Sequence, residues 1–287
     1  MLNYKSLLIA AITLISSTAL AQEIKIFPED FITDKAQYQE HYTENKKGPA
    51  GEPNLRLTDV AEPTITFYRA KSNSSTAKTV LVCPGGGYNI LSMSLEGTEI
   101  CEYLNHHCFN AVLLKYRVPR RPGLEKHEAP LEDAQRAMSY LRANAWALGI
   151  EGDKIGIMGF SAGAHLSVMC STAERCYQQQ DSADCHPSRP AFTILIYPAY
   201  LDGEGFSLAQ EVKPSADTPP TFIVQSQDDK SYVNSSIFYY YALKEAGVPA
   251  TMHLYPNGGH GYGMRKTGAA SDGWERELVE WLNTIDL

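Results

Sequence analysis

Short apolar segments alternate with longer segments of helical periodicity over most of this 287-residue chain. The apolar, β-branched runs predict strands near residues 64–70, 79–84, 110–117, 154–159, 192–197, 220–225 and 250–255. Helical periodicity predicts helices near residues 96–107, 129–147, 162–173, 232–246 and 273–285. Strands that alternate with helices in this way are typical of an α/β fold, a doubly wound, mostly parallel sheet with helices on both faces.

A Gly-x-Ser-x-Gly motif, residues 159–163, joins one predicted strand to the helix that follows it. In this setting the motif holds a serine on a strained turn, and glycines are needed where a side chain would collide with neighbouring backbone. The pattern predicts that Ser161 is a nucleophile. Because a serine hydroxyl needs a base to remove its proton, it also predicts a histidine and an acid elsewhere in the chain.

The histidine and the acid are predicted in loops that follow two later strands. His260 lies in a glycine-rich stretch after the strand near 250–255. The acid is predicted after the strand near 220–225, where we favour Asp228, with Asp229 as the alternative; the third candidate, Asp202, follows the earlier strand at 191–199. Successive side chains at a strand end point to opposite faces, so we expect one of the two adjacent aspartates to reach His260. The order Ser, Asp, His differs from the orders of the chymotrypsin and subtilisin types.

A run of three glycines, residues 85–87, follows the predicted strand near 79–84. Glycines directly after a strand let backbone N–H groups face a bound group. The N–H of Gly86 or Gly87, together with that of Ala162, is therefore predicted to form an oxyanion hole. A phosphate loop is disfavoured because no Gly-Lys-Ser/Thr follows, which leaves a flexible turn as the alternative.

Seven segments then carry a resemblance: CPGGGY (83–88), Glu96-Gly97, LKYRVP (114–119), PLEDAQRAM (130–138), GFSAGAHL (159–166), LIYPAYL (195–201) and GGHGYG (258–263). Together they resemble the acetyl-xylan-esterase-like branch of the α/β-hydrolases. The resemblance implies the α/β-hydrolase fold, with Ser161 as nucleophile, His260 as base and Asp228 as acid. It also implies an oxyanion hole at Gly86 and Gly87, although Pro84 stands where the HGGG motif of other esterases has histidine.

This branch includes secreted carbohydrate esterases, so the resemblance implies as substrate a short-chain ester, with acetyl as the expected acyl group, on carbohydrate such as xylan or xylo-oligosaccharide. Tyr88 and Tyr262 lie close in sequence to the glycine run and to His260, and we expect them to contact the sugar or to wall the pocket. A feruloyl-type esterase, a serine peptidase of the same fold and a non-catalytic binding protein are the alternatives. No Cys-x-x-Cys pair and no His-Glu-x-x-His is present, and we expect neither metal nor cofactor.

Three segments are expected along the chain. Residues 1–21 have the features of a signal peptide: Lys5, an apolar run over 7–15 and the small-x-small sequence of 19–21. Residues 22–62 form an N-terminal extension without a strong period, and residues 63–287 form the catalytic domain. We therefore expect export to the periplasm or the medium. A lipoprotein anchor is not expected, because no cysteine follows the cleavage signal.

The formal net charge is −8, and it becomes −9 once Lys5 is removed with the leader. This negative net charge disfavours nucleic acid and anionic membrane surfaces as partners, because both require a basic surface on the protein. The expected partner is a small-molecule or oligosaccharide ester. Six cysteines in an exported chain permit disulfides, and Cys176 with Cys185 is the favoured pair because they flank the polar stretch 174–190.

Overall fold

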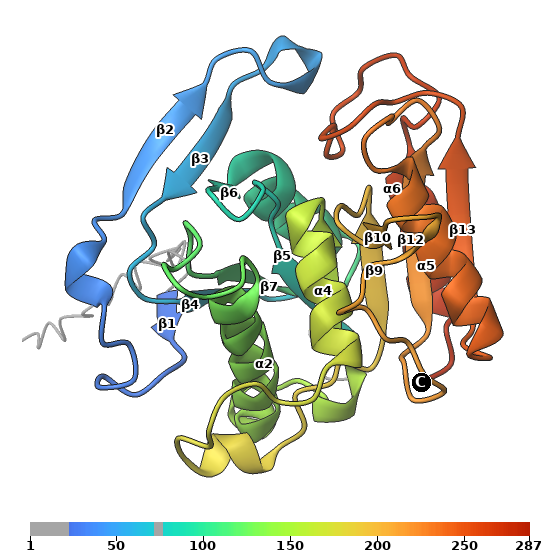
Figure 1. The fold of residues 1–287 in the computed structure, drawn as a ribbon. Helices are drawn as coiled ribbons and strands as arrows, with labels where there is room; N and C mark the ends of the chain where they lie inside the picture. The colour runs from blue at the N-terminus through green and yellow to red at the C-terminus, as the bar shows by residue number, and fades with distance from the viewer. Residues whose placement is uncertain (1–22, 72–76) are drawn as a thin grey trace, which may run out of the picture.

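The computed structural model describes residues 23–71 and 77–287, so the expected signal peptide lies outside the described residues. The main sheet contains β1 (Glu23–Lys25), β4 (Thr64–Tyr68), β5 (Thr79–Cys83), β7 (Asn110–Lys115), β8 (Ile155–Phe160), β9 (Thr193–Ile196), β12 (Thr221–Ser226) and β13 (Ala250–Tyr255). Their spatial order is β1-β4-β7-β5-β8-β9-β12-β13 (Figure 1). β1, β4 and β7 pair antiparallel, and the other neighbours pair parallel.

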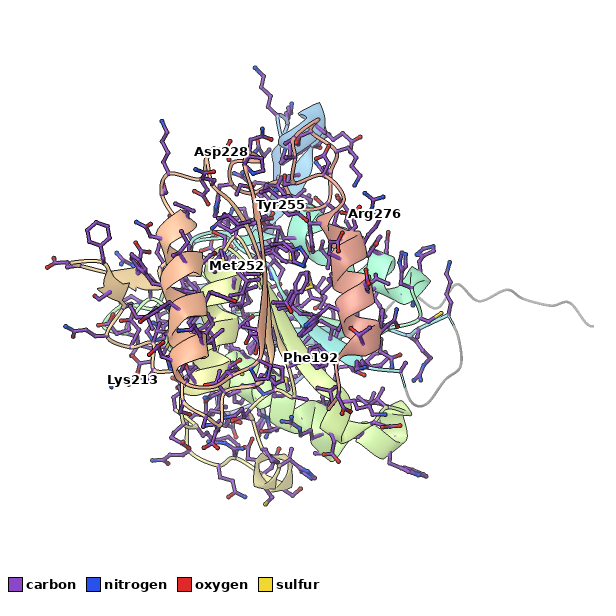
Figure 2. All side chains as sticks on the ribbon, turned by 90° about the vertical axis from the view of Figure 1, so that its right-hand side faces the viewer. Phe192, Lys213, Asp228, Met252, Tyr255 and Arg276 are labelled. Atoms are coloured by element: carbon purple, nitrogen blue, oxygen red, sulfur yellow. The ribbon has the colours of Figure 1, made fainter. Side chains whose placement is uncertain are left out.

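Helices cover both faces of this sheet. They are α1 (Glu99–His106), α2 (Glu128–Ala143), α3 (Ala145–Leu148), α4 (Ala162–Thr172), α5 (Val233–Glu245) and α6 (Trp274–Thr284). Figure 2 shows the sheet nearly edge-on, with α5 on one side of β13 and α6 on the other. Every residue of β5, β7, β8 and β12 is buried, as expected for strands covered on both faces. The predicted doubly wound, mostly parallel sheet is confirmed.

The segment expected to be an N-terminal extension contributes strands to two sheets. β1 forms the edge of the main sheet through its pairing with β4. β2 (His41–Asn45) and β3 (Asn54–Thr58) form an antiparallel hairpin, and β3 also pairs with β6 (Leu91–Ser92), directly after the glycine run. In Figure 1 this hairpin, drawn in blue, lies beside β6. We refer to residues 41–58 as the N-terminal hairpin. It is packed against the domain at the segment that carries the predicted oxyanion loop.

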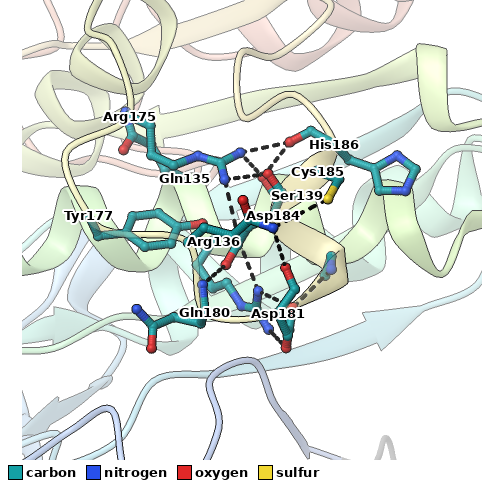
Figure 3. A network of polar contacts seen from close by, with 12 residues as sticks. Gln135, Arg136, Ser139, Arg175, Tyr177, Gln180, Asp181, Asp184, Cys185 and His186 are labelled. Carbon is teal, nitrogen blue, oxygen red and sulfur yellow. Dashed lines mark hydrogen bonds and ion pairs between the residues drawn. The ribbon is translucent and has the colours of Figure 1, made fainter.

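The polar stretch 174–190 is held by ion pairs. Arg136 of α2 binds Asp181 at 2.6 Å and Asp184 at 2.9 Å, and its side chain is 2% exposed (Figure 3). The predicted Cys176–Cys185 disulfide is wrong for this structure, in which both residues are free thiols. Arg136 already fixes the loop that the disulfide was expected to close, so the stretch is ordered without a covalent link.

The parallel pairing brings the loops of the candidate site together. Since β5, β8, β12 and β13 run in the same direction, their carboxyl ends meet at one edge of the sheet. The glycine run, Ser161, the two aspartates and His260 all follow these four strands. In open α/β sheets, this edge is where ligands bind.

Candidate active site

Ser161 lies at the turn between β8 and α4, with φ 52° and ψ −115°. This is a backbone conformation that non-glycine residues rarely adopt, and such strain is frequent at functional sites. The neighbouring glycines make the turn sterically feasible. A Cβ atom at Gly159 would collide with the backbone of Gly163, and one at Gly163 would collide with the carbonyl oxygen of Cys83. The motif therefore presents Ser161 at the end of β8, as predicted.

Ser161, His260 and Asp229 form a continuous line of hydrogen bonds. The Nε2 atom of His260 lies 2.8 Å from Oγ of Ser161, and its Nδ1 atom lies 2.7 Å from Oδ2 of Asp229. A carboxylate can only accept, so Nδ1 carries the proton and Nε2 accepts from the serine hydroxyl. The side chain of Asp229 is 3% exposed, whereas that of His260 is 30% exposed. The imidazole can thus remove the serine proton while its other nitrogen is held by a buried carboxylate.

The prediction that Asp228 contacts His260 is wrong; the structure places Asp229 there. Oδ1 of Asp228 instead accepts the backbone N–H of Gly259 at 2.8 Å. The strand-end argument failed because β12 ends at Ser226 and both aspartates lie in the turn beyond it, where side chains no longer alternate. The N–H of Asp229 donates to the carbonyl of Ser226 at 3.1 Å, which closes this turn. The third candidate, Asp202, accepts a hydrogen bond from Ser235.

The three predicted oxyanion-hole donors surround the serine and are available to a ligand. Gly86 and Gly87 line the same cavity as Ser161, and Ala162 is the first residue of α4. Among the described residues, their backbone N–H groups have no hydrogen-bond acceptor. Gly86 and Gly87 have φ +138° and +65°, and a Cβ atom at Gly86 would collide with the carbonyl of Ile90. Glycine is therefore required for the loop to approach Ser161 in this conformation.

The carboxylate of Glu96 fixes the glycine loop by a hydrogen bond to its backbone. This role was not predicted from the sequence. The Oε2 atom of Glu96 accepts the N–H of Gly85 at 2.8 Å, and its Oε1 atom accepts the hydroxyl of Tyr197 at 2.8 Å. The same hydroxyl accepts the N–H of Gly263 at 3.0 Å, in the loop that carries His260. Burial raises the pKa of this carboxyl above its usual value. The Glu96-Gly97 dipeptide of the resemblance was the available signal, but it does not reveal what the side chain binds.

Tyr88 and Tyr262 do not line the cavity, so their predicted contact with the sugar is wrong. Tyr88 is fully buried, and its hydroxyl lies 2.8 Å from Nδ1 of His165. Tyr262 is also buried, and its ring packs edge-on against Tyr197. Both rings are buried behind the residues that line the cavity, which agrees with the other expectation, that they support the pocket wall. Tyr200 and Tyr232 line the cavity instead, and the ring of Tyr232 lies 4.9 Å from that of His260.

His165 packs in the interior, as expected for a residue one helical turn beyond the nucleophile. Burial lowers its pKa to about 4, so its ring is neutral near pH 7. Its hydrogen bond to Tyr88 joins α4 to the residue that follows the glycine loop. The two buried side chains therefore support that loop from behind and do not reach the nucleophile.

The cavity in front of Ser161 has a volume of about 300 Å³. Four residues of the N-terminal hairpin line it: Asn45, Pro49, Asn54 and Arg56. Sequence analysis missed this wall, although residues 54–58 (NLRLT) alternate with the period of two that indicates a strand. Arg265 ties the hairpin to the rest of the site. It donates to the carbonyls of Glu52 and Pro53 at 2.9 and 2.8 Å, and it binds Glu99 of α1 at 2.6 Å.

Over residues 23–71 and 77–287, no group of three or more His, Cys, Asp or Glu side chains has an arrangement that could hold a metal ion. In the same part of the chain, no helix has both the length and the apolar character needed to cross a membrane.

The fold and the site together define an α/β-hydrolase. Residues 65–195 match the BD-FAE family model, and residues 190–285 match that of the prolyl oligopeptidase family. These matches are consecutive and together cover nearly all of the predicted catalytic domain. The chain is similar to both of these families and has the α/β-hydrolase fold.

Individual relatives agree with this assignment. The chain is 28% identical to an acetylxylan esterase of Xylanibacter ruminicola, over 80% of this chain and 50% of that protein. It is 32% identical to endo-1,4-beta-xylanase B of Butyrivibrio fibrisolvens, over 63% of this chain and 32% of that protein. The chain thus spans half or less of the length of these relatives.

The similarity to one solved structure extends over nearly the whole of this chain and of the chain in that structure. That structure is the acetyl ester-xyloside bifunctional hydrolase from Caldicellulosiruptor lactoaceticus, with a TM-score of 0.72 and 28% identity. The similarity covers 92% of this chain and 96% of that one. The resemblance to the acetyl-xylan-esterase-like branch is confirmed at this level.

Proposed function

We propose that this protein is a serine carboxylesterase that removes short acyl groups, acetyl first, from carbohydrate esters. The observation that carries the proposal is the hydrogen-bonded line of Ser161, His260 and Asp229 beside three backbone N–H groups without an acceptor among the described residues. This arrangement combines an activated nucleophile with donors for an oxyanion.

The reaction follows from these contacts. Oγ of Ser161 attacks the ester carbonyl while Nε2 of His260 takes the hydroxyl proton, and Asp229 stabilises the imidazolium that forms. The N–H groups of Gly86 or Gly87 and of Ala162 bind the tetrahedral oxyanion, and loss of one such donor typically costs about 3–4 kcal/mol. His260 then protonates the departing sugar oxygen. Water activated by the same imidazole finally releases the acyl group from Ser161.

The size and lining of the cavity support a short acyl group on a polar alcohol. Its volume of about 300 Å³ is at the lower end for ligand sites. Asn45, Asn54, Arg56, Tyr200 and Tyr232 give it a polar wall, which suits sugar hydroxyls better than a long alkyl chain. Relatives named as an acetylxylan esterase and an acetyl ester-xyloside hydrolase support the same substrate class. The signal peptide expected over residues 1–21 would bring the protein to extracellular polymers.

The test measures acetate release from acetylated xylo-oligosaccharides and kcat/KM on 4-nitrophenyl esters of increasing acyl length. We expect acetate release, and a steep fall in kcat/KM beyond about four acyl carbons, because a crowded pocket rejects each methylene by roughly 1–3 kcal/mol. Ser161→Ala is the control for hydrolysis at another site or by a contaminant. A preference for octanoate over acetate would contradict the acyl assignment. Release of ferulate or of a peptide amine, with no acetate from any glycan, would favour the alternative substrates.

A further inference from the structure

Arg56 lies on β3 of the N-terminal hairpin, opposite Ser92 of β6. It lines the same cavity as Ser161 and His260. Its backbone is held in a three-stranded sheet between Thr43 of β2 and Ser92. The guanidinium is thus carried by a fixed strand on the wall that faces the nucleophile.

The Arg56 side chain has no partner among the described residues. Its Nε atom is buried without a hydrogen-bond acceptor, and no carboxylate of residues 23–71 or 77–287 forms an ion pair with it. Arg56 as a whole is half-buried, as is Arg265, which binds Glu99, whereas the buried Arg117 and Arg136 bind Asp133 and Asp184. A buried donor without an acceptor is unfavourable, and a charged one more so. Arg56 therefore differs from these structural arginines.

The neighbouring polar groups do not supply the acceptor that the Arg56 side chain lacks. Glu96 is the acidic side chain of the cavity lining, and its oxygens accept from Gly85 and Tyr197. Burial raises the pKa of this carboxyl and so favours its uncharged form, although the nearby Arg56 charge acts in the opposite direction. Asn54 uses its amide to hold β6 and the segment after it, by donating to Ser92 and accepting from Ser94. Arg56 is left as a positive group that is open to a ligand in the cavity.

We propose that Arg56 binds a carboxylate on the sugar part of the substrate, so that the preferred substrate is an acylated glycan that bears an acidic sugar. This inference rests on the proposed esterase function and adds a determinant of its substrate class. A planar guanidinium with several N–H donors matches a carboxylate in a two-point contact and neutralises its charge, which a sugar hydroxyl cannot do. Over residues 41–58 the hairpin has Lys46, Lys47 and Arg56 against Glu44 and Glu52, a formal charge of +1.

The first experiment compares kcat/KM for an acetylated xylo-oligosaccharide that carries one glucuronic acid with that for its neutral counterpart. We expect the wild-type protein to favour the acidic substrate by about tenfold or more, mainly through KM, because a hydrogen-bonded charge pair is worth about that factor. Arg56→Gln should bring the ratio close to one, and Arg56→Lys should leave it in between. Raising the ionic strength should reduce the wild-type ratio.

The matched control is Arg276→Gln, which removes an exposed arginine of α6 that is outside the cavity lining (Figure 2). It should keep the wild-type ratio. A wild-type ratio of one or less, or a ratio that Arg56→Gln leaves intact, would overturn the role of Arg56. Equal loss on both substrates in Arg56→Gln would also overturn it, since the residue would then support the hairpin and not select the substrate.

A binding experiment separates this inference from the proposed function. Calorimetry with the Ser161→Ala protein measures the affinity for the deacetylated oligosaccharide with and without glucuronic acid, and no turnover is needed. We expect tighter binding of the acidic oligosaccharide, lost when Arg56→Gln is added. If the wild-type protein released no acetate and this difference persisted, the esterase proposal would fail and the carboxylate site would stand. If acetate were released and the two oligosaccharides bound equally, the carboxylate site would fail alone.

Discussion

The two sides of the cavity are built differently. On one side, Ser161, Asp229 and His260 each follow a strand of the central parallel sheet, and they bind one another. On the other side, the N-terminal hairpin lies outside that sheet and reaches the site through β6. Its residues either bind the framework, as Asn54 does, or are left open to a ligand, as Arg56 is. The first side carries the groups that we propose to cleave the ester, and the second forms the opposite wall of the cavity.

This difference suggests that the two sides can be altered separately. The groups on the sheet edge depend on strands that are buried on both faces and form the core of the protein. The hairpin joins the domain through the β3–β6 pairing, through the buried Leu57 and through polar contacts, of which Arg265 makes several. Changes on the sheet edge should therefore affect kcat, whereas changes in the hairpin should affect KM and substrate choice.

The largest expected effect is that of Ser161→Ala. Loss of the nucleophile should lower kcat by about 10³-fold or more on every ester, because only the oxyanion donors and substrate binding remain. The melting temperature should change little, since the hydroxyl contacts only the partly exposed His260. Steady-state kinetics and thermal unfolding of the same preparation measure both. Activity within tenfold of wild type would exclude Ser161 as the nucleophile.

The next effect separates the two adjacent aspartates. Asp229→Asn should lower kcat by at least about 10²-fold, because the amide no longer stabilises the imidazolium or selects the tautomer with the proton on Nδ1. Asp228→Asn is the matched control. Its amide oxygen can still accept the N–H of Gly259, so the loss should stay below about tenfold. If Asp228→Asn proved the more damaging substitution, Asp229 would be a structural residue and the acid would be assigned again.

The smallest effect tests the connection between the two sides. Arg265→Gln removes the ion pair with Glu99 and weakens the contacts to Glu52 and Pro53. We expect KM for acetylated xylo-oligosaccharides to rise about three- to tenfold, with a smaller change in kcat, because hydrogen bonds of this kind contribute about 1 kcal/mol each. Arg189→Gln, which removes only wider surface ion pairs at 3.7 and 3.9 Å, is the control. A fall in kcat as large as that of Asp229→Asn would mean that the hairpin also holds the reacting groups in place.

Much of the framework could be predicted from short stretches of sequence. The β13 prediction agrees with its observed bounds, and the Gly-x-Ser-x-Gly motif and the glycine run lie where expected. These features depend on local chemistry, because buried strands need apolar runs and tight turns need glycine. The N-terminal hairpin was missed because β2 is almost entirely exposed and polar, and because the alternation of β3 extends over only five residues.

The sequence by itself determined the α/β framework, the strained turn at Ser161 and the glycine loop, since each is encoded by residues adjacent in the chain. Only the tertiary structure decided which aspartate binds His260, because the path of the turn after β12 orients both side chains. It also decided that Tyr88 and Tyr262 are buried behind the cavity while Tyr200 and Tyr232 face it. Finally, it placed Arg56 in the same cavity as Ser161, with an Nε atom that has no hydrogen-bond acceptor among the described residues. Such contacts join residues far apart in sequence, and their geometry depends on how the surrounding loops pack.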